Sequence, residues 1–172
     1  PVNDKLVARD VYVNILNDAT DYVYITTPYL IMDVELTNAL LSAARRGVDV
    51  EIITPHVPDK WYVHAVTRSF YLQLINAGVK IYEYTPGFIH AKNVICDDKI
   101  ATVGTVNFDY RSLYHNYECG VWMYRTKAIE SMKNDFENTR EISMKITEEM
   151  MAKIPIIKKV VAEILKFFSP LL

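Results

Sequence analysis

The sequence is short of cysteine, of long apolar runs and of basic excess. Cys96 and Cys119 are its only cysteines, too few for a disulfide framework. Both lie in apolar runs, where a reduced thiol behaves as a small hydrophobe, so we expect a reducing compartment. The net charge is −2, and the totals therefore offer no basic surplus that would hold duplex DNA by electrostatics alone.

No apolar stretch approaches the roughly 20 residues that a bilayer-spanning helix needs, and no secretory signal pattern opens the chain. The chain is therefore not expected to cross a membrane by itself. It begins with Pro1 rather than Met, which suggests processing or a piece of a longer protein. With 172 residues, 51% of them hydrophobic, residues 1–172 are expected to form a single domain with a real core.

Hydrophobic periodicity predicts strands that alternate with helices, followed by a cluster of strands. Asp33 is a candidate cap for the second helix, and Gly47 and Gly78 follow the second and third helices. Asp97 and Asp98 predict a turn. Helices are expected over 6–17, 34–46, 59–77, 127–151 and 156–168, and strands over 22–27, 48–54, 79–84, 89–96, 100–103 and 117–124. This order predicts an α/β sandwich with a mixed, partly antiparallel sheet flanked by helices.

The chemistry-bearing residues cluster in the second half of the chain. His90 and Lys92 are two apart in a predicted strand, so both side chains should leave the same face. An imidazole can act as nucleophile or proton carrier, and an ammonium beside it suits a phosphate. Gly104 is expected to let the backbone approach a ligand, and Asn107, three residues later, offers an amide that can donate to phosphate oxygens. Glu118 is expected in the last of these strands, available to orient an imidazole.

These residues match a known signature. The segment His90-Ala91-Lys92, then Asp97, then Gly104-Thr105-Val106-Asn107, resembles the HxKxxxxD-x6-G[ST]xN motif of the phospholipase D superfamily, with Thr105 at the usual serine position. The flanking sequence resembles the C-terminal half of bacterial cardiolipin synthases. The matching segments are 25–29, 46–50, 82–90, 107–112 and the terminal Phe168-Ser169-Pro170-Leu171-Leu172.

The resemblance implies phosphatidyl transfer through a covalent phosphohistidine, with two phosphatidylglycerols giving cardiolipin and glycerol. One histidine would attack phosphorus, and the histidine of the opposing motif would act as acid and then base. Whether His90 or the histidine of the other motif is the nucleophile stays open at this point. The resemblance further implies that Lys92 and Asn107 hold the phosphate oxygens and that Glu118 bonds the His90 ring. No metal or other cofactor is required. Asp97 completes the catalytic set, and the expected substrate-binding residues are Thr105, Arg111 and Tyr29, the last at the carboxyl end of a strand.

The expected partners are phosphatidylglycerol and other anionic phospholipids, a membrane surface, and a second half-site from an N-terminal motif or a second copy of the chain. No nucleic acid is expected. The resemblance places the parent enzyme at the cytoplasmic membrane, with an N-terminal membrane region and a soluble catalytic domain. Two rivals stay open. One is a nuclease or phosphodiesterase that is active as a homodimer, and the other is a non-catalytic phosphate- or lipid-binding domain.

Simpler roles compete for several residues. Asp97 suits a structural turn better than catalysis, and Glu118 could be a buried charge paired with Lys92 or Arg111. The last helix suits core packing or a membrane surface, with core or interdomain packing favoured. Ordinary core or surface roles are expected for His56, His64, His115, Tyr12, Tyr22, Tyr24 and Trp122.

Overall fold

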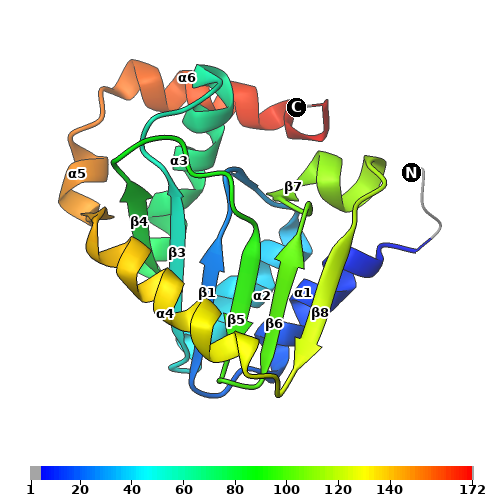
Figure 1. The fold of residues 1–172 in the computed structure, drawn as a ribbon. Helices are drawn as coiled ribbons and strands as arrows, with labels where there is room; N and C mark the ends of the chain where they lie inside the picture. Colours follow the sequence, from blue (N-terminus) through cyan, green and yellow to red (C-terminus); the bar gives the residue numbers. More distant parts are fainter. Residues whose placement is uncertain (1–4, 172) are drawn as a thin grey trace.

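A computed structural model describes residues 5–171; Pro1 and Leu172 lie outside them. A seven-stranded mixed sheet has the order β8-β6-β5-β1-β3-β4-β9, and helices cover both of its faces (Figure 1). Strands β1, β3 and β4 are parallel, whereas β5, β6 and β8 form an antiparallel run and β9 is antiparallel to β4. The α/β sandwich with a mixed sheet is thereby confirmed.

The strands are β1 Tyr22–Thr26, β3 Asp49–Pro55, β4 Lys80–Tyr84, β5 Asn93–Cys96, β6 Ile100–Gly104, β8 Gly120–Tyr124 and β9 Ser143–Ile146. Two further short strands, β2 Leu30–Ile31 and β7 Phe108–Asp109, pair in parallel and make a separate two-stranded sheet that the periodicity did not predict. The helices are α1 Val7–Asp18, α2 Val34–Arg45, α3 Trp61–Asn76, α4 Ala128–Glu141, α5 Glu148–Ala152 and α6 Ile156–Phe167. Two short helical turns are η1 Arg111–His115 and η2 Ser169–Leu171.

Local signals in the sequence explain several of these boundaries. The Asp33 carboxylate accepts a hydrogen bond from the Leu36 amide at 2.7 Å, which confirms it as the cap of α2. Gly47 and Gly78 follow α2 and α3 with φ of +93° and +103°, a left-handed conformation that closes helices at little cost only for glycine.

The sheet buries a different core on each face. The larger core packs α1, α2 and α3 against one face and includes Leu16, Leu40 and Leu74. The smaller core lies under α4, where Tyr24 stacks on Phe136 with ring centroids 4.7 Å apart. Tyr12, Tyr22 and Tyr24 are buried as expected.

One predicted helix is wrong in part. Residues 127–151 form α4, then β9, then α5, because the chain after Glu141 pairs with the otherwise open edge of β4 and buries Ile146 there. The Thr147 hydroxyl then accepts a hydrogen bond from the Met150 amide and begins α5. Tertiary pairing thus overrides a continuous helical pattern.

One strand boundary also differs from the expectation. The predicted strand 117–124 begins only at Gly120, so Cys119 is exposed just before the strand rather than held in an apolar run, while Cys96 is buried. Trp122 is more than half exposed, which places it among surface rather than core aromatics. The last helix contributes only Ala162 as a buried residue, with Leu165 packed against the core. Among residues 5–171, no helix is long and apolar enough to span a bilayer.

Candidate active site

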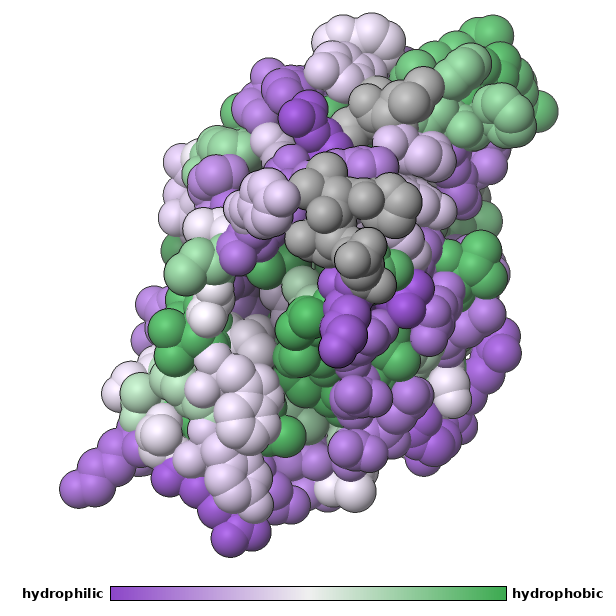
Figure 2. All heavy atoms as spheres, turned by 90° about the vertical axis from the view of Figure 1, so that its right-hand side faces the viewer, coloured by the Kyte–Doolittle hydropathy of each residue, from purple (hydrophilic) through white to green (hydrophobic). Residues whose placement is uncertain are grey.

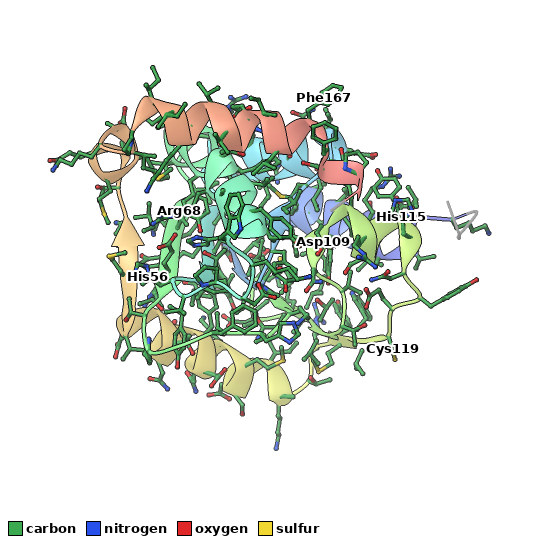
Figure 3. The ribbon with its side chains drawn as sticks, turned by 90° about the horizontal axis from the view of Figure 1, so that it is seen from above. His56, Arg68, Asp109, His115, Cys119 and Phe167 are labelled. Carbon is green, nitrogen blue, oxygen red and sulfur yellow. The ribbon has the colours of Figure 1, made fainter. Side chains whose placement is uncertain are left out.

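The candidate site lies along the upper edge of the sheet in Figure 1, which Figure 3 shows from above. The parallel strands β1, β3 and β4 end there, as does β6, while β5 and β8 begin there. Loops that follow or precede these strands therefore meet at one edge, the usual location of ligands in open α/β sheets.

His90 and Lys92 lie just before β5 rather than inside a strand, because β5 begins at Asn93. The expected period-two strand geometry is thus wrong for this pair. The structure brings the two groups together differently, since Lys92 Nζ donates to the His90 carbonyl oxygen at 2.5 Å. Lys92 is 9% exposed, whereas the His90 ring is exposed and lies against Phe88.

The surroundings of His90 favour its neutral form. Partial burial and the nearby Lys92 charge lower the pKa of His90, against an opposing effect of Asp59. A neutral imidazole has the free lone pair that attack on phosphorus requires. Burial likewise lowers the pKa of Lys92, and the charges of Glu118 and Asp109 oppose that change.

Gly104 allows two strands to approach closely. A Cβ atom at this position would collide with the Cys119 carbonyl oxygen and lie 2.6 Å from the Gly120 Cα. The glycine of the signature therefore serves the β6–β8 pairing, not the backbone approach to a ligand that the sequence suggested. Thr105 joins the same segments, since its hydroxyl donates to Glu118 and accepts from the Cys119 amide at 3.0 Å.

Asn107 is only partly satisfied by its neighbours. Its Nδ2 donates to the Ser112 hydroxyl at 3.1 Å, whereas its buried Oδ1 has no partner among the described residues. Asn107 also bonds to Asp109, a buried carboxyl that desolvation holds at a raised pKa. A buried polar atom without a partner is costly. The Oδ1 atom of Asn107 can therefore accept one further hydrogen bond, for example from a substrate.

The expected hydrogen bond between Glu118 and His90 is not formed among the described residues. One of its carboxylate oxygens accepts from the Thr105 hydroxyl, and the other accepts from Asn116 Nδ2 at 3.0 Å. No Glu118–His90 hydrogen bond occurs within residues 5–171, and Glu118 instead acts to raise the pKa of Lys92. Its position before β8 rather than within it accounts for the difference.

Asp97 lies at the other end of β5 from Lys92, which separates it from the site. Its carboxylate accepts four hydrogen bonds of 2.8–3.0 Å from Thr20, Asp21 and Tyr22, three from backbone amides and one from the Thr20 hydroxyl. These contacts tie the β5–β6 turn to the start of β1, and they lower the pKa of Asp97. The alternative of a structural turn therefore describes Asp97 better than a catalytic role.

The two remaining expected substrate contacts differ in their surroundings. Tyr29 donates to the Asp59 carboxylate at 2.5 Å, and Asp59 also acts on the pKa of His90. Asp59 is thus a site neighbour that the motif search missed, although its position in the loop after β3 was a usable signal. Arg111 is exposed at the start of η1, four residues after Asn107.

A second polar cluster surrounds Glu83, a fully buried residue next to the end of β4. His56 Nδ1 lies 2.8 Å from one Glu83 carboxylate oxygen, and Arg68 donates to both oxygens at 2.8 and 3.0 Å. His64 is 3.6 Å away. Burial alone would raise the pKa of Glu83, but the nearby His64 ring and the hydrogen bonds from Arg68 and His56 hold it at about 2. Figure 3 labels His56 and Arg68, which enter the cluster from the loop after β3 and from α3.

Comparison with known proteins identifies the family. Residues 12–140 match the model of the cardiolipin synthase, phospholipase D-like domain. The chain belongs to this family. It is 49% identical over its whole length to an uncharacterised protein of Streptococcus mutans and covers 37% of it. It is 37% identical over 96% of its length to a cardiolipin synthase of Halalkalibacterium halodurans and covers 33% of that enzyme. The chain thus spans about a third of the length of these relatives.

A solved structure shows the same fold. Phosphatidylserine synthase of Haemophilus influenzae superposes with a TM-score of 0.74 at 15% identity, over 96% of this chain and 45% of that one. The chain is therefore a phospholipase D-like domain of the cardiolipin synthase family. The signature residues His90, Lys92 and Asn107 lie on one sheet edge.

The geometry also shows what the described chain lacks. Phosphoryl transfer through a histidine requires a second group to protonate the leaving oxygen. His56 and His64 contact Glu83, and His115 lies exposed on η1. None of the three contacts His90 in the described part of the chain. Within residues 5–171, His90 therefore has no second histidine beside it.

Proposed function

We propose that this chain is one catalytic half of a phosphatidyltransferase that condenses two phosphatidylglycerols into cardiolipin and glycerol. Its main support is the exposed His90 imidazole, with its lowered pKa, beside the Lys92 ammonium in a chain of the cardiolipin synthase family. Lys92 is the cation that would stabilise charge on the non-bridging oxygens in the transition state.

In the first step, His90 attacks the phosphorus of one phosphatidylglycerol, and the bond from phosphorus to the headgroup glycerol oxygen breaks. A second histidine gives its proton to that oxygen, so glycerol leaves and a phosphatidyl-histidine remains. The hydroxyl of a second phosphatidylglycerol then attacks the same phosphorus while the second histidine takes its proton. Cardiolipin forms and His90 is released. Asn107 would contact a phosphate oxygen or the incoming hydroxyl.

The second histidine would come from another half-site, and strand β8 is the surface proposed for its attachment. β8 is an edge strand of the seven-stranded sheet, and it exposes Val121, Trp122 and Tyr124. The rings of Trp122 and Tyr124 stack with their centroids 5.8 Å apart. An open strand edge with exposed aromatic side chains is typical of a surface covered by another chain or domain. The partner would be another part of a longer polypeptide or a second copy.

Substrate assays distinguish this proposal from its rivals. The chain together with its second half-site, supplied by the longer polypeptide or by a second copy, is expected to form cardiolipin from phosphatidylglycerol vesicles and to leave plasmid DNA intact. DNA cleavage that disappears in a His90→Ala variant would favour the homodimeric nuclease. Phosphatidylglycerol binding with no turnover in any assembly that contains a second half-site would favour the binding domain. Light scattering on the same samples reports whether activity accompanies association.

A further inference from the structure

Helix α6 exposes most of its large apolar side chains, whereas an ordinary surface helix buries them. Ala162 is its one buried residue, and two of its lysines lie half-buried on the side that packs. Lys159 Nζ donates to the Ala152 carbonyl at 3.2 Å, and Lys166 Nζ lies 4.2 Å from the centre of the Phe70 ring. Leu165 packs against the core, whereas the other large apolar side chains are exposed, namely Ile156, Ile157, Val160, Val161, Ile164, Phe167 and the following Phe168.

This apolar face lies at the same end of the molecule as the candidate active site. In Figure 1, α6 runs across the top, above the edge at which β1, β3 and β4 end. Figure 2 shows hydrophobic side chains gathered at the top right, over the end of α6. In the view onto this edge, Phe167 points away from the body of the protein (Figure 3), and it is 83% exposed.

Two hollows connect α6 with neighbouring elements. One, of about 460 Å³ between α3 and α6, is lined mainly by apolar side chains such as Trp61, Leu72 and Val161, with Arg68 and Lys158 among its cations. The other, of about 350 Å³, joins Lys166 and Phe167 to Tyr110, which directly precedes η1. The apolar surface of α6 therefore extends toward the segments that carry the site.

We infer that α6 is an interfacial helix, which inserts its outward apolar face into an anionic bilayer and so presents the catalytic edge to the same membrane. Such helices combine an apolar face with cations that meet lipid phosphates. Two of the three lysines of α6 pack inward, so Lys158, which is exposed, is the cation of this helix that can meet a lipid phosphate, and one such lysine strengthens binding about fivefold. The inference deepens the proposed function by naming the surface on which its substrate lies.

The test measures binding of the 172-residue chain to sedimented vesicles, and the chain offers a matched control. Ile164 on α6 and Ile142 between α4 and β9 are 58% and 53% exposed. Ile164→Ser is expected to weaken binding to phosphatidylglycerol vesicles about five- to tenfold, from the apolar area that it removes. Ile142→Ser should bind like the unchanged chain. Circular dichroism confirms that both variants are folded.

Charge is tested with a second pair of exposed residues. Lys158→Gln on α6 is expected to weaken binding to phosphatidylglycerol vesicles about fivefold, whereas Lys127→Gln before α4 should have no effect. On neutral phosphatidylcholine vesicles the two variants should bind equally. Vesicle binding needs no turnover, so its failure would leave the proposed reaction standing, and a failure of catalysis would leave the docking surface standing.

Three results would overturn the inference. The unchanged chain could fail to bind anionic vesicles at low salt. Ile164→Ser and Ile142→Ser could bind equally well. Finally, light scattering without lipid could show a dimer that Ile164→Ser alone converts to monomer, in which case a second copy covers α6 and the bilayer does not.

Discussion

Replacing His90 with glutamine is expected to lower cardiolipin formation by about five orders of magnitude, because the reaction loses the group that attacks phosphorus. The His90 ring is exposed and donates no hydrogen bond within the described residues that the fold would miss, so the variant should fold normally. The measurement is cardiolipin formed from phosphatidylglycerol, with circular dichroism to confirm folding.

His115→Gln is the matched control, since His115 is also exposed and contacts no site residue. It should retain activity near that of the unchanged chain. If two copies build one site, a tenfold excess of the His90→Gln chain should lower that activity about tenfold, since most active chains would then have an inactive partner. Substantial turnover by His90→Gln would contradict the assignment of the nucleophile.

Replacing Glu83 with glutamine is expected to destabilise the fold by about 3 kcal/mol, because the depressed pKa of Glu83, about 2 against 4.5, measures how strongly its partners stabilise the carboxylate. The pKa is lower in the folded than in the unfolded state. This stabilisation is therefore complete above about pH 4.5 and is lost as the pH falls toward 2. Urea denaturation at pH 7 and pH 3 measures both effects, and the difference between the two proteins should shrink at pH 3.

Glu141→Gln, at an exposed position at the end of α4, should change stability by no more than about 0.5 kcal/mol. If Glu83→Gln were equally mild, the contacts of Glu83 with His56 and Arg68 would be solvent-screened pairs of little net value.

The sequence predicts the residues of the site better than their contacts. His90, Lys92 and Asn107 could be found because the signature keeps them close along the chain. Their geometry depends on distant segments, since Glu118 reaches Thr105 through the β6–β8 pairing and Asp59 reaches Tyr29 from the loop after β3. The structural role of Asp97 was foreseen as an alternative because two adjacent aspartates favour a turn.

For the fold, too, local features could be predicted from the sequence and long-range contacts could not. Local patterns predict α1, α2, α3 and strands β1, β3, β4 and β6 to within about two residues, since capping and periodicity act over short distances. β5 begins four residues later than predicted. Local patterns could not predict β9, which forms because β4 offers an open edge. Nor could they orient α6, because an amphipathic pattern does not state whether its apolar face meets a core or another surface.

The most direct test of the central claim is to trap the covalent intermediate. The chain is incubated with phosphatidylglycerol, quenched in alkali because phosphohistidine is unstable to acid, digested and analysed by mass spectrometry. We predict a phosphatidyl group on the peptide that contains His90 and none on the same peptide of the His90→Gln variant. Cardiolipin formation with no such adduct, or with the adduct on His56, His64 or His115, would contradict the role assigned to His90.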